Sequence, residues 1–488
     1  MTKLKSDYLR EFLEYEHDLK LFEMKIQDVH FWHLIRNDVF FEITRQVFLL
    51  GHSNHEKFSK RIKVINILKS IFSTLLHQPL LFLKQKDILV INHPRRVKSG
   101  DYFECIYTDP ILSDVEISHY VFEYAENFKH KTPVLTSHLK YMDIVNLLVG
   151  INKKFALRKK KLSSIEKEKL CSLFSQLSAR FKISLDVDDW LARATNIIVE
   201  FELKSRYINF MLKKIQPRLI LEVVHYHPDT MLINHLAKLQ NIPIVELQHG
   251  TIDKTTLPYF LPENSMSSYL PDELWVFGQF WKDVTSFPLD DHKIKVLGFP
   301  FIERTFQDQR VSKSNSEKTT ILFLSQWTIG GELSKFASDL SLRLDSQSFE
   351  IIYKLHPAEF SNWNDTYPEL VKSDIKVVDD RDHNLYYYFA LADIQIGVYS
   401  TSIYEGLRFG LKTYIYRIFG YEQMIDLITE KAVKAFTNLE ELIPWLDENE
   451  GDIDYEYYWG KNAKGNILAE ISRHTHHDNN ILINESAE

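Results

Sequence analysis

Short apolar runs recur along residues 219–416, and they constrain the fold more than any other feature of the chain. Most neighbouring runs are separated by connections long enough for a helix, a spacing typical of βαβ units and a parallel sheet. The first set of runs is Leu219–Val224, Ile242–Leu247, Glu273–Phe277 and Lys293–Leu297, and the second is Thr320–Leu324, Phe349–Leu355, Ile375–Val378, Ile394–Val398 and Thr413–Tyr416. We therefore predict an α/β protein with two parallel-sheet domains.

The length of 488 residues also favours more than one domain, because single hydrophobic cores stop growing well below it. Asp87–Asn92 is typical of a first buried strand, residues 110–214 are mostly helical in pattern, and Asp308–Lys318 is a polar linker. The expected parts are an N-terminal helical region (1–85), a first Rossmann-like domain with a helical insertion (86–306), the linker (307–318), a second Rossmann-like domain (319–440) and a C-terminal helical tail (441–488). We expect the two sheet domains to face each other across a cleft.

Composition excludes several classes of protein. Hydrophobic residues make up 44% and charged residues 26%, as in globular rather than disordered proteins. A net charge of −8 argues against a general nucleic-acid binder, which needs a basic surface. Two cysteines cannot form a disulfide framework, and the charged N-terminus does not resemble a signal peptide. We therefore expect a cytoplasmic protein.

One segment could bring the protein to a membrane. Arg61–Lys84 is apolar with basic residues at both ends, but Lys69, His77 and Pro79 make it a poor membrane-spanning helix. It could lie on an anionic membrane surface, or it could be a helix that faces the core of the first domain. We favour the core-facing helix.

Polar residues suited to a phosphate follow two strands of the second set. His356-Pro357 follows one, and Ser400, Thr401 and Ser402 follow another. Ligands of open parallel sheets bind beyond the carboxyl ends of the strands, so an imidazole and three hydroxyls there indicate a nucleotide phosphate site. A helix that starts at the hydroxyls adds free N–H groups and a partial positive charge. Either motif alone would be an ordinary histidine or helix cap, and their combination favours function.

Three further residues extend this predicted donor site. Glu405 follows the hydroxyls and could accept hydrogen bonds from a ribose, although an acid near a helix start is also common. Gly330 and Gly331 follow the first strand of the second set, where paired glycines let the backbone approach a ligand. Their surroundings lack the spacing of a P-loop or a dinucleotide fingerprint.

Histidines and carboxylates follow the strands of the first set. Glu246 and His249 close one strand, and His225 and His227 follow the strand before it. Because parallel strands end at one edge, His249 or Glu246 could act as a general base on an acceptor hydroxyl. No histidine or cysteine pair has the spacing of a metal site, so we predict none. Histidines with a purely structural or supporting role remain an alternative, for His225 and for His235.

The loop after the first predicted strand carries His93, Arg95 and Arg96. Arginine pairs well with carboxylate or phosphate. His93 and Arg95, with His227, are therefore candidates to bind the acceptor or an anion. Solvated surface arginines are an equally good explanation.

Together these motifs resemble a known family. His356-Pro357, then the hydroxyl cluster leading into a helix with Glu405, is similar to the donor domain of GT-B glycosyltransferases, particularly bacterial enzymes of capsule, lipopolysaccharide and teichoic-acid assembly. The stretch from Glu246 to Pro300 looks like the end of their acceptor domain, and the likeness covers residues 218–425. It implies that His356 and the hydroxyls bind donor phosphate and that Glu405 binds ribose.

The resemblance implies a metal-independent glycosyltransferase without a cofactor. It would move a sugar from a nucleotide-sugar co-substrate, with a CMP-sugar favoured, to a glycan or lipid-linked acceptor in bacterial surface-polysaccharide synthesis. The chain lacks the acidic Asp/Glu-Asp/Glu-Gly motif of many sialyltransferases, which puts sialic acid in doubt. We expect a cytoplasmic enzyme with peripheral contact at the inner face of the cell membrane. Alternatives are a CDP-polyol phosphotransferase, a sugar-nucleotide epimerase and a non-catalytic assembly protein.

Overall fold

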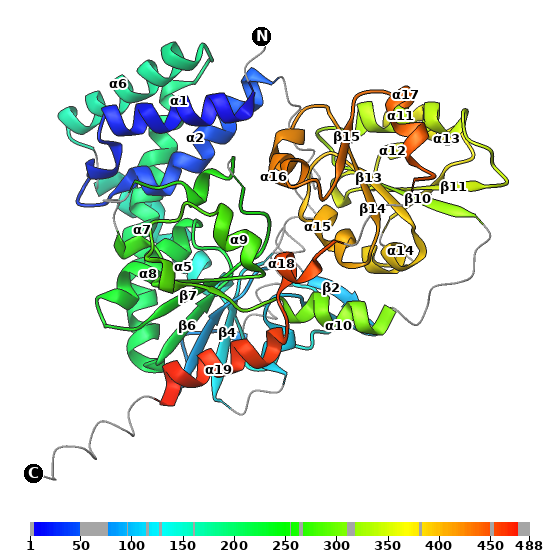
Figure 1. Ribbon diagram of the computed structural model, residues 1–488. Helices are drawn as coiled ribbons and strands as arrows, with labels where there is room; N and C mark the ends of the chain where they lie inside the picture. The colour runs from blue at the N-terminus through cyan, green and yellow to red at the C-terminus, as the bar shows by residue number, and fades with distance from the viewer. Residues whose placement is uncertain are drawn as a thin grey trace, which may run out of the picture.

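The computed structural model describes residues 4–48, 77–94, 96–113, 117–125, 129–159, 162–253, 255–262, 267–309, 318–379, 383–448 and 453–476. Two parallel sheets stand side by side, and helices α1 (Lys5–Asp18), α2 (Phe31–Val47) and α6 (Ser164–Phe181) lie beyond the first of them (Figure 1). Arg95, residues 61–76 of the apolar segment Arg61–Lys84 and residues 310–317 of the predicted linker lie outside the described residues.

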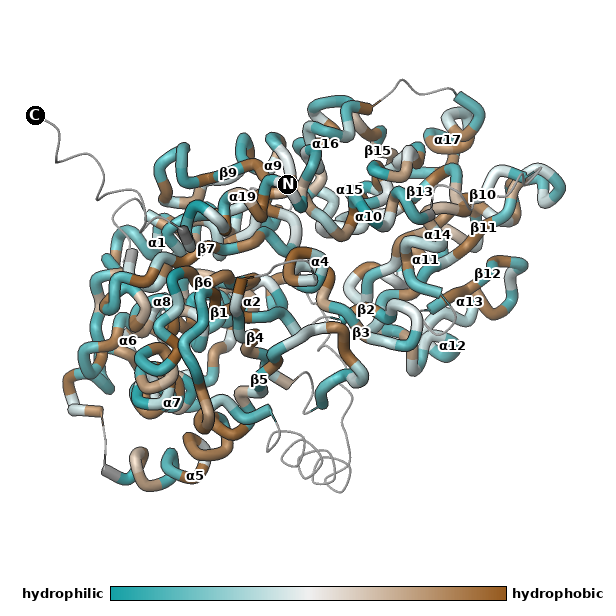
Figure 2. The backbone as a smooth tube through the Cα atoms, turned by 90° about the horizontal axis from the view of Figure 1, so that it is seen from below, coloured by the Kyte–Doolittle hydropathy of each residue, from teal (hydrophilic) through white to brown (hydrophobic). Residues whose placement is uncertain are grey.

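The first sheet has seven strands in the order β5-β4-β1-β6-β7-β8-β9, and all its pairs are parallel. Its strands are β1 (Ile88–Ile91), β4 (His119–Glu123), β5 (Leu139–Tyr141), β6 (Leu219–Glu222), β7 (Ile244–Leu247), β8 (Glu273–Val276) and β9 (Ile294–Val296). Helices cover both faces, so every residue of β1, β6 and β7 is buried. Figure 2 accordingly shows brown, hydrophobic tube along the inner strands.

The prediction that residues 110–214 are mostly helical was incomplete. This stretch contains α5 (Asp143–Lys159), α6 and α7 (Val187–Ile215), but also the strands β4 and β5. β4 begins with His119 and ends with Glu123, and β5 has three residues. Strands this short, with polar ends, lack the long apolar run that marks a buried strand in a sequence.

The second sheet has six parallel strands in the order β12-β11-β10-β13-β14-β15. They are β10 (Thr319–Leu324), β11 (Phe349–Lys354), β12 (Lys376–Val378), β13 (Ile394–Gly397), β14 (Lys412–Tyr416) and β15 (Lys434–Phe436). Helices α11 (Gly330–Ser341), α14 (Leu385–Leu391) and α15 (Thr401–Arg408) are among its crossover connections. The spacing of the apolar runs in the sequence predicts helical connections of this kind between parallel strands.

A buried ion pair holds the N-terminal helices together. Arg36 Nε on α2 lies 2.7 Å from Glu16 Oε1 on α1, and both side chains are almost fully buried. Trp32 Nε1 donates to the same carboxylate at 2.7 Å. The guanidinium also donates to the carbonyls of Leu257 and Phe260, which fixes the helices to the first domain. Such a pair tolerates burial because its donors and acceptors are satisfied.

The end of the chain returns from the second sheet to the first. Helix α18 (Tyr455–Trp459) packs between α9 (Gln279–Val284) and α15, and α19 (Ala463–His476) crosses the first sheet (Figure 1). Ile467 and Ile471 of α19 are buried in the core of that sheet. A Cβ on Gly278 would collide with the Tyr458 backbone, so glycine permits this close approach.

Shorter elements complete the described fold. They are the hairpin β2 (Arg96–Ser99) and β3 (Tyr102–Cys105), and the helices α4 (Asp109–Leu112), α8 (Pro228–Lys238), α10 (Pro300–Gln309), α12 (Trp363–Thr366), α13 (Pro368–Val371), α16 (Ile425–Thr429) and α17 (Leu439–Leu442). Two Rossmann-like sheets with a C-terminal helix that returns to the first sheet form the GT-B arrangement. The predicted α/β fold class, with its N-terminal helical region, is confirmed.

Candidate functional site

The hydroxyl cluster lies at the switch point of the second sheet. From β10 the chain adds β11 and β12 on one side, whereas β13, β14 and β15 lie on the other. The crevice between such strands is where open α/β sheets bind ligands. The loops after β10 and β13 meet here, because the Gln326 amide donates to the Tyr399 carbonyl at 2.6 Å.

Ser400 and Ser402 form the N-terminal cap of α15. Ser400 Oγ accepts from the backbone N–H of Ser402 at 3.1 Å, and Ser402 Oγ donates to Ser400 Oγ at 2.6 Å. Thr401 Oγ1 instead accepts from the backbone N–H of Thr251 at 3.1 Å. Three adjacent hydroxyls are therefore gathered at a helix N-terminus, where backbone N–H groups favour anions.

His356 lies at the same edge, two strands further along. It caps the short helix Pro357–Glu359, with its Nδ1 accepting from the Ala358 N–H at 3.1 Å. An accepting Nδ1 leaves the proton of a neutral ring on Nε2, which makes that nitrogen a donor. Strand β10 separates β11, which precedes His356, from β13, which precedes Ser400.

The loops after β10 and β11 are joined beneath His356 by Glu359. Its Oε2 accepts from the His356 N–H at 2.6 Å, and its Oε1 accepts from Ser325 Oγ at 2.9 Å and from Tyr367 Oη at 2.5 Å. Burial raises the pKa of Glu359 despite these hydrogen bonds. A Cβ on Gly330 would collide with Tyr367 and Glu359, so packing alone accounts for this glycine.

Gly331 and Glu405 differ sharply in exposure. A Cβ on Gly331 would meet open space. Glu405 is the fifth residue of α15 and only 3% exposed. A ribose contact at Glu405 would therefore require the cover over this carboxylate to open.

Glu246 is the third residue of β7, and its carboxylate accepts hydrogen bonds within a buried network. Its Oε2 is 2.7 Å from His225 Nδ1, and Tyr259 Oη donates to its Oε1 at 3.1 Å. His225 Nε2 lies 3.2 Å from the Pro258 carbonyl. Glu246 is fully buried, so its position suits holding neighbouring side chains better than contacting a substrate.

His249 connects this network to the surface. Its Nδ1 lies 3.9 Å from Glu246 Oε1, and its Nε2 lies 3.0 Å from Tyr226 Oη. Burial, and then the Glu246 charge, raise the pKa of Tyr226, so the phenol keeps its proton and can donate to Nε2. The backbone carbonyl of His249 accepts from Tyr107 Oη at 2.7 Å. At 3.9 Å the Glu246 carboxylate is a neighbouring charge rather than a hydrogen-bond partner of Nδ1, and His249 is a candidate general base through Nε2.

Sequence reasoning missed Tyr226, Thr251 and Gln326. Tyr226 stands between His225 and His227, so its place in that motif was the available signal. Thr251 and Gln326 act through contacts across long separations in the chain, which no local pattern marks.

A large cavity lies at the switch point of the first sheet. Its volume is about 930 Å³, and it is lined by the loops after β1, β4 and β6 and by helices α5, α7 and α8. His93 and His227 are in this lining, as the prediction of a shared edge requires. The rings of His93 and His249 are 6.1 Å apart, which links the cavity to the candidate base.

Arg96, which shared the predicted loop, has a structural role. Its Nη2 lies 2.5 Å from Glu123 and its Nη1 3.3 Å from Asp109, and the side chain is 1% exposed. Paired and covered in this way, it cannot contact a ligand.

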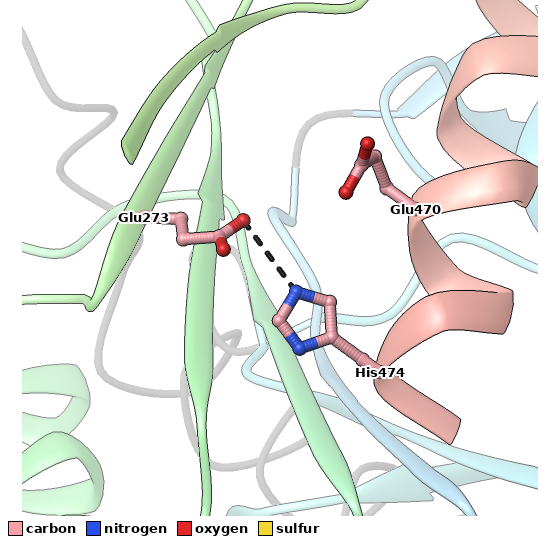
Figure 3. A group of neighbouring side chains, drawn as sticks. All are labelled: Glu273, Glu470 and His474. Atoms are coloured by element: carbon pink, nitrogen blue, oxygen red, sulfur yellow. Dashed lines mark ion pairs between the residues drawn. The ribbon is translucent and has the colours of Figure 1, made fainter. Parts of the chain in front are cut away.

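Glu273, Glu470 and His474 form a cluster whose geometry could suit a metal (Figure 3). His474 Nε2 is 3.5 Å from Glu273. Lys295 Nζ already donates to both carboxylates at 2.9 Å. This cluster joins α19 to β8 and β9, so docking of the C-terminal helix explains it.

Neither a protein-family model nor a curated protein sequence matches this chain. Among solved structures, it is similar to a putative UDP-N-acetylglucosamine 2-epimerase from Listeria monocytogenes, with 13% identity and a TM-score of 0.48 over 80% of this chain and 97% of that one. A UDP-GlcNAc 2-epimerase from Neisseria meningitidis bound to UDP-GlcNAc has 14% identity and a TM-score of 0.46, over 79% and 98% of the two chains.

The wall teichoic acid polymerase TagF is also similar, with 12% identity and a TM-score of 0.45 over 86% of this chain and 98% of that one. Likeness this remote transfers no activity to this chain. Within the described ranges, no helix has both the length and the apolar character needed to cross a bilayer.

Proposed function

We propose that the protein is a glycosyltransferase that moves a sugar from a nucleotide-sugar to an acceptor in surface-polysaccharide synthesis. The donor phosphate binds at Ser400, Thr401 and Ser402, and the acceptor binds in the cavity of the first domain. One observation carries this proposal: Thr251 N–H donates to Thr401 Oγ1 at 3.1 Å. The loop that holds the candidate base therefore touches the candidate phosphate site across the two domains.

In the proposed reaction His249 Nε2 takes the proton of the acceptor hydroxyl, and Glu246 stabilises the charged ring. The acceptor oxygen forms a bond to the anomeric carbon of the sugar, and the bond between that carbon and the donor phosphate breaks. Serine and threonine hydroxyls and the N-terminus of α15 stabilise the charge that develops on the leaving nucleotide. The proposal needs no bound metal. His356 Nε2 would donate to the same phosphate.

The finer assignments are also proposals. The donor is a CMP-sugar, the acceptor is a glycan or lipid-linked chain, and the enzyme works in the cytoplasm at the inner face of the membrane. Hydroxyls and a helix N-terminus suit the single phosphate of a CMP-sugar, because that phosphate carries little charge to neutralise.

A thermal-shift panel of CMP, CDP, UDP and GDP on the full chain tests the donor site. We expect at least one nucleotide to raise the melting temperature of the wild type more than that of Ser400→Ala. Absence of any shift with the wild type would contradict the proposal. Incubating the matching nucleotide-sugar without acceptor tests the epimerase alternative, because only an epimerase converts the sugar there.

A further inference from the structure

We propose that the cavity of the first domain binds an uncharged sugar, so that the acceptor is a neutral glycan end and not a phosphorylated group. This inference rests on the proposed function and names its acceptor class. It is based on three features of the cavity lining: paired charges, carboxylates that can accept hydrogen bonds from hydroxyls, and apolar side chains.

Charges in the lining are paired with one another or with neighbours. Lys204 Nζ lies 2.7 Å from both oxygens of Asp229, and these side chains are 11% and 9% exposed. Lys204 is the one lysine or arginine among the described lining residues. Since a carboxylate already neutralises it, this lysine would offer a phosphate little attraction to offset the loss of its hydration.

The other charged groups of the lining are carboxylates. Asp143 accepts from His130 Nε2 at 2.8 Å, and Glu200 pairs with Lys153. Carboxylates accept hydrogen bonds from neutral hydroxyls strongly but repel anions. Sugar hydroxyls, which both donate and accept, therefore match these groups better than phosphate oxygens do.

Apolar side chains supply the rest of the wall. They are Ile91, Leu147, Val149, Ile197, Phe201 and Val224. The Phe201 ring is held by contact with Tyr269, with ring centres 5.7 Å apart. A sugar ring offers C–H faces to such side chains, and pockets that combine apolar walls with a few polar groups are typical ligand sites.

Tyr124 stands in the cavity lining beside Asp229, with its hydroxyl covered. Burial, and then the Asp229 carboxylate, raise the pKa of Tyr124 well above its usual value, so its hydroxyl keeps its proton. On the side towards the second domain, His93 lies beside His249. Only the His93 ring thus separates a sugar at this side of the cavity from the proposed base His249.

Saturation-transfer NMR on the full chain without nucleotide tests this assignment. The probes are methyl glucoside, methyl galactoside and chitobiose, with sn-glycerol 3-phosphate as the anionic comparison. We expect at least one neutral probe to bind, and Phe201→Ala to raise its Kd by about tenfold, the loss of one aromatic contact. Phe210→Ala is the matched control, because Phe210 lies on the same helix, 43% exposed and outside the lining.

If Phe201→Ala fails to fold, Glu200→Gln is the second variant, because the Glu200 side chain is 37% exposed. It should weaken the neutral probe by about threefold, as loss of a charged acceptor predicts, whereas Glu168→Gln on α6 should not. Binding of sn-glycerol 3-phosphate alone, no binding of any neutral probe, or an equal loss in Phe210→Ala would overturn the proposal. Nucleotide shifts on the same samples report on the donor site separately, so the two proposals can fail independently.

Discussion

The two sheets have similar topologies but differ at their switch points. At the first, the ends of β1 and β6 adjoin a cavity of about 930 Å³. At the second, Gln326 bridges to the Tyr399 carbonyl and Thr328 bonds to the Tyr399 hydroxyl. One site is preformed, whereas side chains of the protein itself bridge the other. We infer that an acceptor binds without rearrangement but that a nucleotide must displace part of the bridge.

Replacing the proposed base gives the largest expected effect. His249→Ala should lower kcat about 100-fold or more, as loss of a general base predicts. Both ligands should still bind, because the cavity and hydroxyls remain. Rates of sugar transfer measure the change, with the exposed His292→Ala as control. Transfer at the wild-type rate in His249→Ala would remove this residue from the mechanism.

Breaking the buried ion pair of the first site tests whether that site is rigid. Lys204→Met leaves the Asp229 carboxylate covered without its cation, and should lower the free energy of unfolding by about 3 kcal/mol. Urea unfolding measures this loss. Lys213→Met, on the exposed side of the same helix, should change stability little. Equal stability of the two variants would show that the cavity does not depend on the pair.

The hydroxyl row of the second site should affect nucleotide binding more than stability. Ser400→Ala removes a phosphate donor and should weaken nucleotide affinity by about tenfold, with about 1 kcal/mol of stability lost through the helix cap. Ser163→Ala, the cap of α6, controls for the capping loss. Calorimetric titration measures the nucleotide affinity, which Ser400→Ala should weaken and Ser163→Ala should not. Unchanged affinity in Ser400→Ala would place the phosphate elsewhere.

Removing the Gln326–Tyr399 hydrogen bond at the second switch point tests whether it hinders nucleotide binding. Gln326→Ala deletes the amide that donates to Tyr399, so a nucleotide no longer has to displace it. The affinity should rise by about threefold, a fraction of one net hydrogen bond. Titration calorimetry measures this too. Weaker binding would mean that Gln326 itself contacts the nucleotide.

The smallest effect is expected where α19 docks. Burial acts to raise the pKa of Glu273, but hydrogen bonds from His474, Lys295 and Trp275 outweigh it and lower the pKa to about 2. Its contribution to stability is therefore present above pH 4.5 and lost as the pH falls towards 2. Melting temperatures across this range should fall less steeply in Glu273→Gln. An identical slope would exclude the carboxylate as the titrating group.

The sequence was sufficient to predict strands that are buried on both faces. β1 and β10 are continuous apolar runs, and parallel sheets covered by helices require such runs. β4 was missed because Glu123 at its end is polar, and the reason for that polarity, its pairing with Arg96, is a tertiary contact.

The candidate site could be predicted only as far as strand ends allow. His93, His249 and Ser400 were predicted as site residues because polar residues after buried strands mark the ligand edge. The burial of Glu405 and the packing around Gly330 depend on neighbours distant in the sequence, so exposure could not be predicted. Nor could the contact of Thr251 with Thr401, which requires the two domains to dock.

Hydrogen–deuterium exchange with saturating nucleotide, the one that shifts the melting temperature most, tests the central claim most directly. If the nucleotide phosphate sits where the two domains touch, residues 249–252 and 399–408 should both become protected, while residues 92–94 and 227–230 of the first cavity should not. Protection confined to the first cavity, or absent from both loops, would contradict the account.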